Sequence, residues 1–351
     1  MNKHNIRNPT GAPEMDTGRR NFLKASSAVA LAPMLLTSRK GGAQIIDPVI
    51  PPSPPTTPWQ EELPDAIAPL EQVDSLSPTP TGAVDPSGEE CGRANHQRWA
   101  EFFGDSSLPP GSADLYELRA TEYSDWVFHP DYPPQRIWGF EGNTAGGPEL
   151  NPTIFGRYGR PIICRLYNEL PQNHVGFGTP EVSMHLHNLH APSESDGFPG
   201  DYFSAFKAGP TLGGPGRFKD HFYPNVYAGL DEYGGIGDPI QALGTLWYHD
   251  HTLDFTAPNA SRGLAGFYLL FDHLDSGDEN DRTPGALRLP SHPYDYPLMF
   301  QDKRFDADGV HFYDQLNPEG TLGDKVTVNG KIEPVLRVAS RKYLLRLLNA
   351  G

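Results

Sequence analysis

Short apolar runs bounded by glycine or proline constrain the fold of this 351-residue chain more than any other feature of its sequence. In several of these runs apolar and polar residues alternate, which is typical of strands with one buried face. Strands are expected at residues 113–120, 160–170, 244–248, 263–271, 297–302 and 325–328. The last run is followed by Asn329-Gly330, a strong hairpin signal. Together with 37 glycines and 37 prolines, the pattern predicts an all-β protein in which antiparallel strands form β-sandwiches.

The expected strands fall into two sets, which indicates two domains. A charged connector rich in turn residues, Asp275–Pro284, separates the sets. We expect a first domain at residues 93–272 and the start of a second at 273–351. The second is expected to be incomplete, because a sandwich that stops at Gly351 would leave an unpaired strand edge. Residues 44–92 are dense in proline and predict an extended arm across the surface.

The first 43 residues predict an export signal. Arg19 and Arg20 precede an apolar run, residues 25–36, that is too short to span about 30 Å of hydrocarbon. The pattern resembles a twin-arginine signal cleaved after Ala43, which implies a periplasmic or secreted protein with no membrane span. Its removal leaves 21 basic and 42 acidic residues, a net charge of −21, and a surface that would repel nucleic acid.

Two His-X-His pairs carry the strongest functional signal. They lie in Met184-His185-Leu186-His187 and in Trp247-Tyr248-His249-Asp250-His251. Residues i and i+2 of a strand share one face, so each pair presents two imidazoles side by side. Neutral imidazole is a ligand for copper, zinc, iron or nickel. Two such pairs on adjacent strands would clamp a metal cluster.

The chain has only two cysteines, Cys91 and Cys164. They could pair in an oxidising compartment, or Cys164 could be a buried inert thiol within its apolar run. Neither cysteine lies in a His-Cys-His arrangement.

The histidine segments resemble the first two copper motifs of the multicopper oxidases, and most closely those of the spore-coat laccase and bilirubin oxidase branch. Further matches lie at residues 134–140, 195–199, 261–268 and 328–331. The resemblance covers most of residues 113–351. It implies tandem cupredoxin-like Greek-key sandwiches. It also implies a laccase-like enzyme that couples one-electron oxidation of phenols, pigments or metal ions to reduction of dioxygen to water.

The resemblance implies a copper-binding role for each of four histidines. His185 would bind the type 2 copper, while His187, His249 and His251 would bind the paired type 3 coppers. In this family the remaining ligands of the trinuclear centre, and the type 1 copper, come from a third domain with His-Pro-X-His-X-His and His-Cys-His motifs. This sequence contains neither motif. We therefore expect a fragment that is inactive by itself, and the sequence reveals neither its small-molecule reductant nor its oligomeric state.

Three other residues near the histidine pairs have expected roles that come either from the family resemblance or from the local sequence. In the spore-coat laccase branch the aspartate that matches Asp196 assists proton delivery to reduced oxygen, a general-acid role. Without the resemblance, Asp196 would be an ordinary turn residue before glycine. Asp250 points away from a metal by strand alternation and could orient an imidazole or be structural. His190 matches no copper ligand and is expected to be loop structure.

Two other classes of function stay open on the residues alone. The spacing of His185, His187 and His190 partly matches a dinuclear zinc motif, so a mononuclear or dinuclear zinc hydrolase is one alternative. That reading leaves the second histidine pair unexplained. The other alternative is a non-catalytic, exported cupredoxin-like protein, although such relatives commonly lose the histidines that this chain retains.

Overall fold

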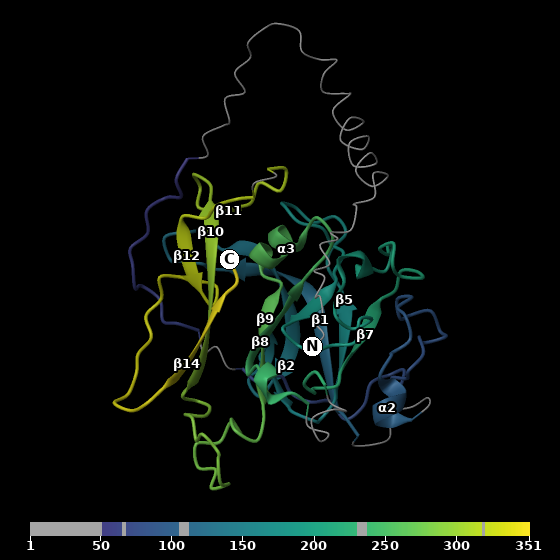
Figure 1. Ribbon diagram of the computed structural model, residues 1–351. Helices are drawn as coiled ribbons and strands as arrows, with labels where there is room; N and C mark the ends of the chain where they lie inside the picture. Colours follow the sequence, from purple (N-terminus) through teal and green to yellow (C-terminus); the bar gives the residue numbers. More distant parts are fainter. Residues whose placement is uncertain (1–50, 65–67, 105–111, 230–236, 318–319) are drawn as a thin grey trace, which may run out of the picture. The chain divides into compact units, whose positions relative to one another are not determined.

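The computed structural model describes residues 51–64, 68–104, 112–229, 237–317 and 320–351 (Figure 1). The predicted twin-arginine signal at residues 1–43 lies outside these ranges. All described residues belong to one unit, Pro51–Gly351, in which strands far outnumber helices. No helix in this part of the chain combines the length and the apolar character that crossing a bilayer would require.

Two sheets enclose the main core. The first has the strand order β3-β2-β1-β5-β7 and the second has the order β4-β9-β8-β6. Their bounds are β1 Asp114–Trp126, β2 Gln135–Thr144, β3 Gly147–Leu150, β4 Ile154–Arg157, β5 Ile162–Asn168, β6 Met184–His187, β7 Phe218–Tyr223, β8 Thr245–Asp250 and β9 Ala265–Phe271. Side chains from both sheets, among them Leu118, Phe140 and Tyr248, pack into one buried cluster. This is the arrangement expected of a β-sandwich.

Antiparallel pairs form most of the two sheets, as expected, but two pairs of strands are parallel. β1 pairs in parallel with β5, and β4 pairs in parallel with β9. The chain leaves β1 through β2, β3 and β4 before it returns as β5, so β5 enters the first sheet from the same end as β1. Parallel neighbours require such a long connection, and the sequence pattern of a single strand does not reveal it.

The second set of expected strands forms a third sheet (Figure 1). Its bounds are β10 Asp295–Phe305, β11 His311–Phe312, β12 Lys325–Val328, β13 Lys331–Ile332 and β14 Leu344–Asn349. The strands follow the order β11-β10-β12-β13, and β14 pairs in parallel with β10. Between β12 and β13, Asn329 and Gly330 have φ angles of 49° and 80°, as a two-residue hairpin turn requires. The predicted hairpin is therefore confirmed, while the domain boundary at residue 272 stays a prediction.

The proline-rich arm contributes to the core as well as covering the surface. Leu70, Leu76 and Cys91 are all buried. The amide of Leu70 donates to the Thr153 carbonyl at 2.9 Å, and the amide of Ser53 donates to Asp324 Oδ2 at 2.8 Å. The arm thus bonds to residues beside the sandwich and, 271 positions along the chain, to the segment that leads into β12.

A short helix that the sequence did not predict follows the arm. Trp99 and Phe103 of α2 (Trp99–Phe103) pack against Phe222 of β7. The outer face of β7 is covered in this way, and every residue of the strand is buried. The other helical turns in the described part of the chain are η1 Pro199–Asp201, η2 Pro239–Gln241 and α3 Thr256–Arg262.

Cys91 and Cys164 are both free and fully buried. Burial raises the pKa of the Cys91 thiol to about 12 and that of Cys164 further. The structure therefore has two inert thiols rather than a disulfide.

Candidate metal centre

The two His-X-His pairs lie on neighbouring strands of the second sheet. β6 pairs antiparallel with β8, and this register sets His185 opposite His249 and His187 opposite Trp247. Leu186 and Tyr248, the residues between the histidines, are buried in the main core. Strand alternation therefore brings the imidazoles to the opposite face of the sheet. The prediction that the pairs lie on adjacent strands is confirmed.

The four imidazoles form one cluster. The ring of His185 lies 5.3 Å from that of His187, 5.3 Å from that of His249 and 5.2 Å from that of His251, measured between centroids. Ligand nitrogens of His185, His187 and His249 all lie within 4.8 Å of one another. His251 stacks on His249 at 5.6 Å and extends the group to a fourth ring.

The nitrogen positions fit a metal ion. His187 Nδ1 and His249 Nε2 are 3.4 Å apart. Two ligands of one tetrahedral ion, with metal–nitrogen bonds of about 2.0 to 2.1 Å, lie about 3.3 Å apart. An all-imidazole donor set suits copper or zinc and is unlike the oxygen-rich sites of calcium or magnesium. These residues could therefore hold a transition metal.

Electrostatics keep two of the rings neutral near pH 7. Burial, together with the other imidazoles, lowers the pKa of His249 to about 3, although a hydrogen bond to the Asp250 carbonyl opposes the shift. Burial and the neighbouring rings also lower the pKa of His187. Because a neutral imidazole keeps a lone pair, both rings are ready to act as ligands without first losing a proton.

Asp196 lies against His185. Its backbone carbonyl accepts a hydrogen bond from His185 Nδ1, and its carboxylate Oδ1 is 3.5 Å from the same nitrogen. Burial on its own would lower the pKa of His185, but the hydrogen bonds to Asp196 outweigh it and the pKa is raised. Because a carbonyl oxygen only accepts, Nδ1 carries the proton and the lone pair is on Nε2. The Asp196 side chain itself is about half exposed, at 45%.

Asp250 has a structural role that sequence alone left open. Its buried carboxylate accepts hydrogen bonds from the Ser183 amide at 2.8 Å, from Thr252 and from Asn259 Nδ2 at 2.9 Å. Burial raises the pKa of Asp250 to about 6 against these bonds. Its side chain contacts no imidazole through these bonds. It ties the start of β6 to the end of β8 and so fixes the distance between the two histidine pairs.

Two contacts were not predicted from the sequence, one at the site and one in the loop that carries Asp196. Trp247 stacks on His249 with ring centroids 4.1 Å apart, and it also contacts His187 at 5.3 Å. Because Trp247 is two residues before His249 on one strand, the same alternation could have placed it. Glu194 is buried beside His96, and no sequence pattern near either residue predicts that contact. His190 is exposed and lies outside the group of ligand atoms, as expected of a loop residue.

Comparison with known proteins bears on this geometry. No protein-family model matches the chain. It is 33% identical over 251 residues to a laccase of Bacillus stratosphericus, a match that covers 64% of this chain and 43% of that laccase. It is 31% identical over 242 residues to the bilirubin oxidase of Albifimbria verrucaria, covering 67% of this chain and 33% of that protein. A crystal structure of a multi-copper oxidase from Pediococcus acidilactici shares the fold, with a TM-score of 0.54 and 19% identity over 87% of this chain and 48% of that one.

The chain therefore spans less than half the length of these curated relatives. The structural match confirms the mostly-β, cupredoxin-like fold. The sequence matches confirm the resemblance found in the histidine motifs. Over about two thirds of its length, this chain is a relative of the multicopper oxidases, bacterial laccases and a bilirubin oxidase among them.

Proposed function

We propose that the chain is part of a copper-dependent oxidoreductase of the laccase type. Such an enzyme removes single electrons from a small-molecule reductant, a phenol, a pigment or a metal ion, and passes four of them with four protons to one dioxygen to give two water molecules. The observation that carries the proposal is the convergence of four imidazoles, from β6, from β8 and from His251 directly after β8, into one cluster beside the second sheet. No observation in the described residues favours a zinc hydrolase.

In this proposal the four histidines divide between two kinds of copper. His185 would hold the type 2 copper through Nε2, and His187, His249 and His251 would hold the type 3 pair. Bound copper would supply the one-electron steps that dioxygen reduction requires. The chain contributes two rings that are already neutral, His187 and His249, and strand pairing together with the Asp250 hydrogen bonds positions the histidines.

Asp196 is proposed as the general acid that delivers protons. Its carboxylate lies beside the His185 ring and is partly open to water. A proton taken from solvent at Oδ1 would therefore be carried to the edge of the histidine cluster. The role differs from that of Asp250, whose carboxylate is buried and fully used in holding the strands together.

The organisation of the whole protein is also part of the proposal. Residues 1–43 would direct twin-arginine export to the periplasm or the exterior, and residues 44–92 would form an arm. The first cupredoxin-like domain would span residues 93–272, and a second would begin at 273. Export would place the acidic mature surface in an oxidising compartment.

Copper titration of the chain tests this proposal. We expect stoichiometric Cu(II), with nitrogen hyperfine coupling in the electron paramagnetic resonance spectrum. His185→Ala and His249→Ala should each lose copper, because each removes a nitrogen from the cluster. The matched control is His190→Ala, which removes an exposed imidazole from the same segment and should bind copper as the parent does. Binding of zinc but not copper, or copper binding unchanged in His249→Ala, would overturn the proposal.

A further inference from the structure

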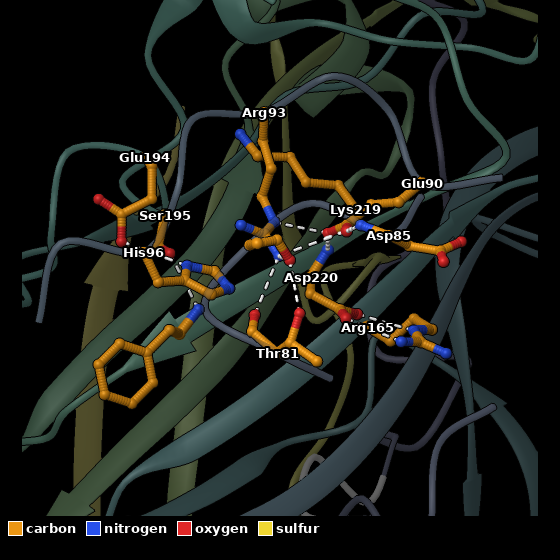
Figure 2. A network of polar contacts seen from close by, with 12 residues as sticks. Thr81, Asp85, Glu90, Arg93, His96, Arg165, Glu194, Ser195, Lys219 and Asp220 are labelled. Carbon is orange, nitrogen blue, oxygen red and sulfur yellow. Dashed lines mark hydrogen bonds and ion pairs between the residues drawn. The ribbon is translucent and has the colours of Figure 1, made fainter. Parts of the chain in front are cut away.

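The loop that carries Asp196 is fastened on the side away from the histidines. Glu194 is buried, and its Oε1 lies 3.3 Å from His96 Nδ1 (Figure 2). The same oxygen lies 3.3 Å from the Gln97 amide nitrogen. Next to it, the Oγ atom of the buried Ser195 accepts a hydrogen bond from the Phe222 amide of β7 at 2.9 Å. The segment just before α2 and the strand β7 therefore both bind the loop, through Glu194 and Ser195 respectively.

The other end of the same loop presses on the metal-site strand. The Asp196 carbonyl accepts the Nδ1 hydrogen of His185. Gly197 has a φ angle of 77°, and a Cβ atom there would lie 2.3 Å from the Met184 carbonyl oxygen and 2.5 Å from His185 Cα. Only glycine allows so close an approach in that conformation. Any movement of the loop would therefore be passed directly to the hydrogen bond on His185.

The distance between the two fastenings is short. Glu194 and Asp196 are two residues apart, so their Cα atoms are separated by at most about 7 Å of chain. Ser195 between them is fully buried and hydrogen-bonded, which removes the freedom that would absorb a shift. A rigid segment of three residues thus connects Glu194 with the Asp196 carbonyl, which is hydrogen-bonded to the His185 ring.

The chemistry of Glu194 argues against a purely local role. Burying a carboxylate is costly unless hydrogen bonds compensate, and among the described residues Glu194 Oε2 has no partner. His96 is equally buried, stacks on Trp99 at 5.6 Å and has a pKa lowered by burial, so the neutral ring donates through Nδ1. A surface turn would need no such group. The buried pair of Glu194 and His96 therefore sets the position of the loop.

We propose that Glu194 is a positioning residue for the metal centre. Held by His96 and Gln97, it fixes the loop so that the Asp196 carbonyl keeps the proton of His185 on Nδ1 and leaves Nε2 free for a metal. This rests on the proposed copper site, but the position of the proton is a property of the metal-free chain. Copper binding by the histidines and the positioning role of Glu194 can therefore be refuted separately.

The test compares Glu194→Ala and Glu194→Gln with a matched control, Glu90→Gln. Glu90 is as deeply buried and accepts a hydrogen bond from Arg93, which also lies in the segment before α2 (Figure 2). It makes no hydrogen bond to the loop at 193–197. Loss of stability alone should therefore affect the control as much as the Glu194 variants. His96→Phe is a further variant, which keeps the stacking on Trp99 but cannot donate to Glu194.

Two measurements are made on each variant. Long-range nitrogen–proton correlation spectra of the metal-free chain, labelled at histidine, report which nitrogen of His185 carries the proton, with the signal assigned from a His185→Ala sample. Cu(II) titration reports the affinity. For Glu194→Ala we expect a mixture of His185 tautomers and an affinity lowered about tenfold, which corresponds to about one hydrogen bond. Glu194→Gln retains an acceptor oxygen and should recover most of the Nδ1-protonated tautomer and most of the copper affinity. His96→Phe should change the tautomer and the affinity in the same direction as Glu194→Ala.

The positioning role is overturned if Glu194→Ala leaves the tautomer pure and the affinity within about twofold. It is also overturned if Glu90→Gln produces the same changes. If Glu194→Ala does not fold, His96→Phe decides the question by the same criteria. Absence of copper binding in the parent chain would overturn the proposed function, while the tautomer in the metal-free chain would still decide the role of Glu194.

Discussion

Lys303 provides a sharp test of how β10 packs on the rest of the chain. Its side chain is 3% exposed, and Nζ donates to the Ser261 carbonyl at the end of α3 at 2.5 Å. Burial lowers the pKa of this amine from 10.5 to about 7, against the opposing effect of Asp302. The folded chain therefore releases a proton that the unfolded chain keeps between pH 7 and pH 10.5.

Because the unfolded state binds more protons in that range, the free energy of unfolding should rise with pH. Integrating the two pKa values from pH 7 to pH 9 gives a gain of about 2 kcal/mol from this one group. In Lys303→Met this gain should disappear. The measurement is urea unfolding at pH 7, 8 and 9, compared with Lys342→Met, which replaces an exposed lysine and should keep the slope. Parallel curves for the parent and Lys303→Met would show that Lys303 is not buried as a neutral amine.

Three further outcomes follow from packing and charge. Gly330→Ala places a Cβ at a φ of 80° and should lower the free energy of unfolding by about 1 to 2 kcal/mol in urea titrations. Asp220→Asn leaves the buried guanidinium of Arg165 without its charged partner and should cost about 3 to 5 kcal/mol, more than the double variant with Arg165→Met. Cys91 and Cys164 should react with an alkylating reagent only after denaturant is added, because both are buried with raised pKa values.

The strands of this fold were predictable where the sequence pattern is local. The expected runs at 113–120, 263–271 and 325–328 all coincide with strands, and the Asn329-Gly330 turn has the conformation its residues favour. Two imidazoles on one face follow from the two-residue period of a strand alone. That β6 and β8 would be neighbours was a hypothesis from chemistry, and the register of His185 against His249 confirms it.

What could not be predicted depends on contacts between distant residues. β7 reads as an amphipathic strand, Phe218-Lys219-Asp220-His221-Phe222-Tyr223, yet both of its faces are buried. Its charges are matched by Arg165, 55 residues earlier than Asp220, and by Asp201 opposite Lys219. Likewise the partner of Glu194 is 98 positions away. A pattern within one strand contains no information on partners at such separations.

The arm sets an order on how the chain reaches its final form. Ser53 is among the first described residues, but its bond to Asp324 joins positions 271 apart, and its Oγ also accepts the Phe305 amide. Contacts of such sequence separation form late, because the intervening chain must be ordered before they can be made. A ribosome that has released only the sandwich would therefore carry a nascent protein in which Ser53 still lacks both of these partners. This part of the arm is fixed only after β10 and the segment before β12 have been made.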